Sequence, residues 1–167
     1  LNIASCQKRT GMLDDAYETL FGAEDLAIDF AYDDVKWITW FKTAEFLHEY
    51  GASVEGAGYA RLADGYYRKA VDLVTECPQC YGGSAHLARG LFDQYARFLV
   101  ERGDWREALH VLEKKYAVDR VMLVAMANPQ FGDAADRDRF AKYEAGVREM
   151  TETRGAISSL LVAGEPA

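Results

Sequence analysis

Apolar side chains recur every three or four residues along most of this chain, the spacing that places them on one face of an α-helix. The strongest example follows Ser84, a residue type that often begins a helix. The apolar residues of this predicted helix are Leu91, Phe92, Tyr95, Ala96, Phe98 and Leu99. Because the periodicity extends over nearly the whole chain, the sequence predicts an all-α fold without β-sheet.

Glycines separate two predicted helices in the first third of the chain. The apolar residues of the first are Leu13, Ala16, Tyr17, Leu20 and Phe21, and we expect Gly22 to end or bend it. Residues 23–50 contain neither Gly nor Pro, which predicts one long helix or two abutting ones, with Gly51 as the stop signal. The apolar stripe in the second half of this segment consists of Trp37, Trp40, Phe41, Ala44 and Leu47.

Turn-forming residues divide the middle of the chain. Residues 51–58 contain three glycines and predict a loop, and Pro78 ends the helix after it. The apolar face of that helix consists of Tyr59, Leu62, Ala63, Tyr66, Ala70, Leu73 and Val74. A tight turn is predicted at Gly103-Asp104. The stripe that follows the turn consists of Trp105, Ala108, Leu109, Leu112 and Tyr116.

Two further helices are predicted in the C-terminal part. A short buried helix at 118–127 ends before Pro129, because the residue before a proline avoids the α region. The charged amphipathic helix that follows has four inward residues, Phe140, Tyr143, Val147 and Met150.

The length and composition fit one domain, because half of the 167 residues are hydrophobic and can bury a core without disulfide bonds. We expect the single domain 1–167 to contain an N-terminal arm at 1–11, helical hairpins at 12–127 and a C-terminal helix at 134–162. The hairpins are expected to stack as an array or to pack as an irregular helical bundle.

The charge of the chain limits its partners. The formal net charge of −8 repels phosphate backbones, which excludes nucleic acid as an expected partner and favours a basic one. No apolar run approaches the roughly 18 residues of a membrane-spanning helix, so we expect no membrane span.

The three cysteines, Cys6, Cys77 and Cys80, are an odd number and predict no disulfide framework. Reduced thiols fit a cytoplasmic protein, and a Cys77–Cys80 bridge outside the cytosol is the alternative. Ile3-Ala4-Ser5-Cys6 resembles a bacterial lipobox, so a periplasmic or lipid-anchored location is also open. The C-x-x-C pair follows a predicted helix end, where the helix dipole disfavours a thiolate, and we expect no redox or zinc function.

Residues 91–118 resemble a tetratricopeptide repeat, a helix–turn–helix unit of 34 residues. The large, small and apolar residues of the repeat's first helix have counterparts in Phe92, Tyr95, Ala96 and Leu99. Gly103-Asp104 matches the turn, Ala108 is the small residue where two helices meet, and Leu112 fills the next gap. The resemblance implies a right-handed array of helical hairpins.

The chain also departs from the repeat. Lys115 stands where the repeat prefers Ala, and Arg120 where it often has Pro. Upstream, a long insertion separates two segments that imitate the two helices of a repeat. Their matching residues are Trp40, Thr43, Ala44 and Leu47 in one segment and Gly65, Tyr67 and Ala70 in the other. The resemblance therefore covers about half of the chain.

The resemblance implies a non-catalytic scaffold that holds a protein or peptide in a concave groove and needs no cofactor. We expect residues left over from core packing to line the groove: Tyr66, Tyr67, Tyr81 and Arg97. Asp25, Asp29 and Asp33 are four residues apart and are expected to form an acidic helix face for a basic partner, or else an ordinary solvated surface. A periplasmic, transporter-associated protein of the same architecture is a further alternative.

A metal site is the competing hypothesis. Two Glu-x-x-His motifs, Glu45–His48 and Glu107–His110, resemble those of ferritin-like di-iron proteins. Two further carboxylates, Glu18 and Glu76, would complete the set. Against this hypothesis, Glu107 lies in the first turn of its predicted helix, and His110 points away from the apolar stripe. Solvated Glu and His side chains are the simpler interpretation.

Overall fold

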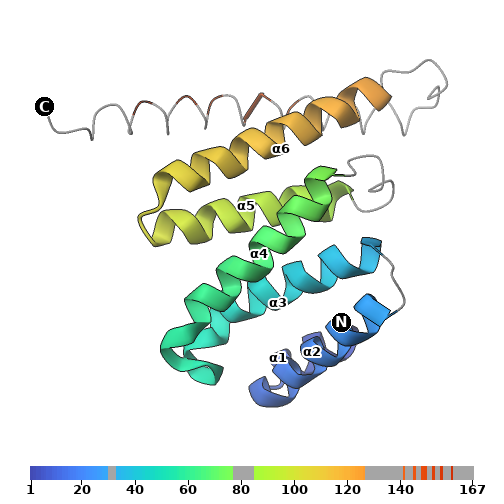
Figure 1. Cartoon of the computed structure of the whole chain (residues 1–167), viewed down its shortest axis with the longest axis vertical. Coiled ribbons are helices and arrows are strands. Elements are labelled where there is room, and N and C mark those ends of the chain that lie inside the picture. Colours follow the sequence, from blue (N-terminus) through green and yellow to red (C-terminus); the bar gives the residue numbers. More distant parts are fainter. Residues whose placement is uncertain are drawn as a thin grey trace, which may run out of the picture. The chain divides into compact units, whose positions relative to one another are not determined.

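The computed structural model describes residues 1–29, 33–76 and 85–126. Beyond these ranges it describes seven single residues, Ala141, Ala145, Arg148, Glu149, Glu152, Gly155 and Ser159. Every regular element in the described part of the chain is helical, which confirms the all-α prediction (Figure 1). None of the described helices is long and apolar enough to cross a membrane.

Figure 1 labels the described helices in chain order. Their bounds are α1 (Asn2–Arg9), α2 (Leu13–Asp29), α3 (Asp33–Val54), the 3-10 turn η1 (Gly56–Gly58), α4 (Tyr59–Glu76), α5 (Ala85–Glu101) and α6 (Trp105–Met126). The chain divides into two compact units. The first comprises residues 1–76 with 83–91, and the second comprises 77–82 with 92–167.

In the first unit each helix packs against the next, α1 on α2, α2 on α3 and α3 on α4 (Figure 1). The predicted stripe of α3 is confirmed, except that Trp40 is only partly buried. Its fully packed members are Trp37, Phe41, Ala44 and Leu47. The buried side chains of α4 are Ala63, Tyr66, Tyr67, Ala70, Val71 and Val74. These apolar faces form the core of the unit.

Two glycines and the N-terminal arm behave differently from the predictions. Gly22 does not end a helix, because α2 continues through it to Asp29, and α3 continues through Gly51 to Val54. Gly51 is needed for another reason: a Cβ there would lie 2.5 Å from the Cβ of Tyr59, at the start of α4. Residues 1–11, which were predicted as an N-terminal arm, form α1 and the turn after it.

The α1–α2 and α5–α6 connections use the same turn. Gly11 and Gly103 have φ angles of 80° and 79°, in the left-handed region that glycine adopts without strain. The following amide reaches back to the helix it leaves, with Met12 N to Gln7 O at 2.9 Å and Asp104 N to Leu99 O at 2.9 Å. This is a Schellman motif, which satisfies carbonyls at the end of a helix. The sequence predicted the second turn and missed the first.

The second unit contains the hairpin predicted from the repeat-like segment. The buried residues predicted for α5 are all confirmed, although Leu91 belongs to the first unit. On α6 the buried apolar residues are Ala108, Val111, Leu112 and Val118, whereas Trp105 is 39% exposed. The predicted stripe was therefore rotated by part of a turn. Residues 118–126 continue α6 and do not form a separate helix.

A polar contact joins the two helices of this hairpin at Lys115, the position where the tetratricopeptide repeat prefers alanine. The Lys115 side chain, which is almost completely buried, extends from α6 to α5 and donates from Nζ to Asp93 Oδ1 at 2.6 Å. The single described residues between 141 and 159 are helical. Most of the C-terminal helix predicted at 134–162 lies outside the described residues, so it stays a prediction. Ser84 and the four predicted inward residues at 140–150 lie outside the described residues.

Candidate partner-binding surface

The inner face of α2 carries a buried carboxylate that joins three helices. Glu24 is only 8% exposed and accepts hydrogen bonds from Trp40 Nε1 of α3 at 2.9 Å and from the Tyr66 hydroxyl of α4 at 2.7 Å. Lys69 Nζ of α4 lies 3.7 Å from the same carboxylate. Burial and the bond to Glu24 raise the pKa of Tyr66 above its usual range. Glu24 is therefore part of the core.

The outer face of α2 carries four exposed carboxylates, which we call the acidic stripe: Asp14, Glu18, Asp25 and Asp29. Steps of four, seven and four residues along a helix bring them to one face, because seven residues make about two turns. Helix α2 contains no Lys or Arg. Within the described part of the chain none of the four forms an ion pair. The stripe therefore presents uncompensated negative charge to solvent.

Two features of this face are unfavourable in the free chain. Asp29 is the last residue of α2, where the negative end of the helix dipole repels a carboxylate. Gly22 occupies the middle of the stripe, where an added Cβ would meet no atom within 4 Å and where Gly is less favourable than Ala. Neither Asp at position 29 nor Gly at position 22 is required by the packing of the described residues.

Exposed apolar side chains accompany the stripe. On α2 these are Phe21, Leu26 and Ile28, and Val35 lies at the start of α3. Leu26 and Val35, exposed to 59% and 43%, border an open groove of about 540 Å³. The residues that line this α2–α3 groove are Leu1, Asn2, Ala23, Leu26, Ala27, Val35 and Thr39.

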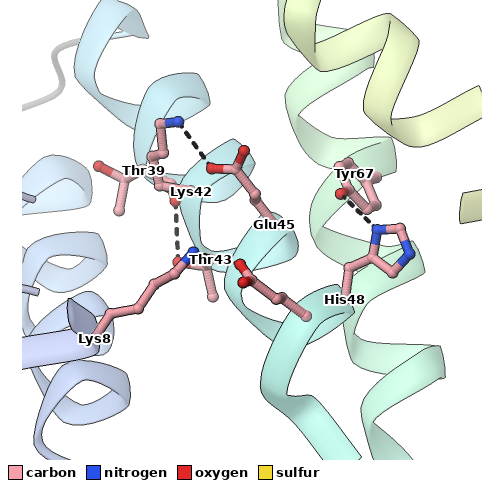
Figure 2. A network of polar contacts seen from close by, with 8 residues as sticks. Lys8, Thr39, Lys42, Thr43, Glu45, His48 and Tyr67 are labelled. Atoms are coloured by element: carbon pink, nitrogen blue, oxygen red, sulfur yellow. Dashed lines mark hydrogen bonds and ion pairs between the residues drawn. The ribbon is translucent and has the colours of Figure 1, made fainter. Parts of the chain in front are cut away.

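The α2–α3 groove contains an unsatisfied polar atom. Thr39 is fully buried, and its hydroxyl oxygen has no hydrogen-bond partner among the described residues. Its carbonyl accepts a bond from the Thr43 hydroxyl at 3.0 Å, and the Thr39 side chain lies on the opposite side of α3 from His48 and Tyr67 (Figure 2). Buried hydroxyls without partners are uncommon in folded proteins.

A second hollow, of about 270 Å³, lies between α1, α2 and α3, and its charges are already paired. Lys42 Nζ donates to Glu45 Oε2 at 2.8 Å. Lys8 donates to Glu49, and this bond holds the pKa of the Glu49 carboxyl below its usual value. These pairs join α1 to α3 and stabilise the turns of α3.

The structure separates the three aspartates that were predicted to share a helix face. Asp25 and Asp29 belong to the acidic stripe on α2, but Asp33 is the first residue of α3. Asp33 also accepts a hydrogen bond from Lys36 Nζ at 3.0 Å, so its charge is compensated locally. The predicted acidic face therefore keeps Asp25 and Asp29 and loses Asp33.

The residues predicted to line a groove are dispersed. Tyr66 and Tyr67 are 8% and 0% exposed, so both pack in the core and present no ring to a partner. Arg97 is exposed on α5, in the other unit. Tyr81 lies outside the described residues. The prediction for Tyr66 and Tyr67 failed because their burial depends on the helices that pack against α4. The sequence pattern of α4 alone does not show where those helices lie.

The six side chains of the metal hypothesis belong to four helices of two units. They are Glu18 on α2, Glu45 and His48 on α3, Glu76 on α4, and Glu107 and His110 on α6. Among the described residues no three His, Cys, Asp or Glu side chains come together as metal ligands. Figure 2 shows why the α3 motif fails: Glu45 points to Lys42, whereas His48 Nδ1 lies 3.5 Å from the Tyr67 hydroxyl.

Comparison with family models, with curated proteins and with solved structures finds no match for this chain. The helical hairpins agree with the predicted architecture, and the tetratricopeptide-like family stays a prediction. The function must therefore be argued from the surface itself.

Four residues of this surface were missed by the sequence analysis: Asp14, Glu18, Leu26 and Val35. The signal for the two carboxylates was present, because residues 13–29 contain six acidic residues and no basic one. Their spacing would have placed them on one face once the helix was known to continue through Gly22. Leu26 and Val35 had no comparable signal, because an exposed apolar residue resembles a core residue in sequence.

Proposed function

We propose that the protein is a non-catalytic helical scaffold that binds a basic segment of a protein partner through the outer face of α2. The observation that carries this proposal is the acidic stripe, four exposed carboxylates on a helix without Lys or Arg. Positive charge on a partner accelerates association and relieves the repulsion among the carboxylates. The α5–α6 hairpin, with its repeat-like turn at Gly103, supports a scaffold architecture.

The two unfavourable features of the stripe also support a binding role. A basic partner compensates the charge of Asp29 at the C-terminal end of α2, where the helix itself repels it. A glycine in the middle of a contact face allows another backbone to approach closely, and this accounts for Gly22. An ordinary solvated surface gains from neither feature.

The test begins with a photo-crosslinking amino acid placed at Ile28, beside the stripe, or at Val121, an exposed residue of α6. A protein captured at Ile28 but not at Val121 is then purified. Its association rate with the unlabelled chain is measured at low and at moderate salt.

The double variant Asp25→Asn/Asp29→Asn is expected to associate several-fold more slowly than the wild type at low salt, because long-range attraction acts on the encounter rate. The difference should shrink as salt rises, since exposed charges are screened within about 10 Å at 0.1 M. The control Asp72→Asn/Glu76→Gln removes the same charge from exposed positions of α4. Equal rates for the first variant and the wild type at both salt concentrations would contradict the proposal.

A further inference from the structure

We infer that the α2–α3 groove takes the apolar face of a basic amphipathic helix supplied by the partner. This inference rests on the proposed function and specifies what the partner must present: apolar side chains for the groove and Lys or Arg for the acidic stripe. The two recognition elements are adjacent, because Leu26 borders the groove and lies between Asp25 and Asp29 in the sequence of α2.

The groove is suited to aliphatic side chains. Its described lining is mostly apolar, with Ala23 and Ala27 on α2 and Leu26 and Val35 at its exposed border. Its volume of about 540 Å³ accommodates several side chains of a helix whose apolar residues recur every three or four positions. Burial of Leu26 and Val35 by a partner removes from water two apolar surfaces that the free chain leaves exposed.

Thr39 is the buried polar residue of the groove lining. Its hydroxyl lacks a hydrogen-bond partner among the described residues and is almost inaccessible, so recognition of an occupant rests on the apolar border of the groove and on the acidic stripe.

Charge argues against other occupants of the same surface. In a symmetric dimer the same patch faces itself, so two acidic stripes would be brought together. Anionic lipid surfaces repel the stripe for the same reason. A basic segment of a protein is the occupant whose charge complements Asp25 and Asp29 on the described surface.

The experiment measures the affinity of the full 167-residue chain for three fluorescent synthetic peptides. The first is a helix-forming peptide with Leu on one face and Lys on the other. The second has the same composition in scrambled order, which removes the apolar face, and the third replaces every Lys by Glu. The first peptide should bind at least about tenfold more tightly than either control, the effect of losing one strong contact.

A matched pair of variants locates the site. Val35→Ser should weaken binding of the first peptide about tenfold, again the effect of one strong contact. The matched control Val121→Ser changes a valine of similar exposure on α6, 46% against 43%, and should leave binding unchanged. A third variant, Thr39→Val, removes the buried hydroxyl with little change in shape and should maintain or raise the melting temperature.

Each contrary result overturns the inference in an identifiable way. Equal affinity for the ordered and scrambled peptides would show that charge alone acts, which overturns the groove and leaves the proposed function standing. Equal affinity for the Lys and Glu peptides would overturn the basic character of the occupant. Self-association that Val35→Ser abolishes would assign the groove to a second copy of the chain. If a partner captured at Ile28 is not displaced by the Lys peptide, the scaffold function holds and the amphipathic-helix inference fails.

Discussion

Both faces of α2 carry carboxylates, but the inner one is buried and hydrogen-bonded whereas the outer ones are exposed. On the inner face Glu24 receives hydrogen bonds from Trp40 and Tyr66 and is nearly inaccessible to solvent. On the outer face its sequence neighbour Asp25 is exposed and has no ion-pair partner among the described residues. Adjacent acidic residues therefore have different roles, because one residue along a helix rotates the side chain by about 100°.

This difference shows how negative charge is divided between the core and the exposed surface. The inner carboxylate is matched by donors from two other helices, so it fixes the packing of α2, α3 and α4. The outer carboxylates form no ion pair with any described residue and remain exposed to solvent. A net charge of −8 conceals this division, because it counts Glu24 and Asp25 alike.

The largest expected effect comes from removing the inner carboxylate. Glu24→Ala leaves the Trp40 N–H and the Tyr66 hydroxyl without their acceptor and should lower the free energy of unfolding by about 3 kcal/mol. Asp25→Ala, at the neighbouring exposed position, should change it by less than about 0.5 kcal/mol. Urea denaturation of both variants measures the contrast, and similar losses would remove the distinction between the two faces.

The second-largest expected effect comes from removing the Tyr66 hydroxyl of α4, which donates to Glu24. Tyr66→Phe removes one bond to a charged acceptor and should cost about 2 kcal/mol at neutral pH. The folded-state pKa of Tyr66 is raised, so the tyrosine favours folding below its unfolded pKa of about 10, and this contribution is lost as the pH rises above that value.

Denaturation of the wild type between pH 9 and 11.5, roughly the range around the tyrosine pKa, should show the loss directly. The Phe variant should lose stability less steeply over the same range. A residual slope is expected from Tyr17, because burial raises its pKa as well. Parallel curves for the wild type and Tyr66→Phe would contradict the assigned role of the Tyr66–Glu24 bond.

The smallest effect separates the two ends of the acidic stripe. Asp29→Asn removes a charge from the C-terminal end of α2 and should stabilise the chain by about 0.5 kcal/mol. Asp14→Asn removes a charge from the first turn, where the helix dipole favours it, and should destabilise by a similar amount. Thermal denaturation at low salt measures both shifts. Shifts of the same sign would show that repulsion along the stripe outweighs the dipole.

The parts of the fold that sequence predicted are those governed by local pattern. The stripe from Leu91 to Leu99 and the Gly103 turn depend on residues close together in the chain, and both are confirmed. Gly22 and Gly51 misled the prediction because glycine weakens a helix without always ending it. Tertiary packing decides the outcome at such positions, as the contact of Gly51 with Tyr59 illustrates.

The candidate surface was less predictable because it depends on which side of each helix is covered. Asp25 and Asp29 were identified from charge density alone, and Glu24, in the same cluster, proved to be internal. Asp33 was assigned to the helix of Asp25 and Asp29, whereas α2 ends at Asp29 and α3 begins at Asp33; no Gly or Pro in the sequence 23–50 signals this boundary. Glu45 and His48 satisfied a sequence motif but point to different neighbours (Figure 2).

The buried Glu24 also has a mechanical consequence. A partner that pulls on the outer face of α2 loads a helix that is tied through this carboxylate to Trp40 and Tyr66. Displacement of α2 would have to break both bonds together, so the load is shared by α3 and α4 and is not borne by the α1–α2 turn alone. Glu24 thus ties α2 to α3 and α4 and restrains the outer face of α2.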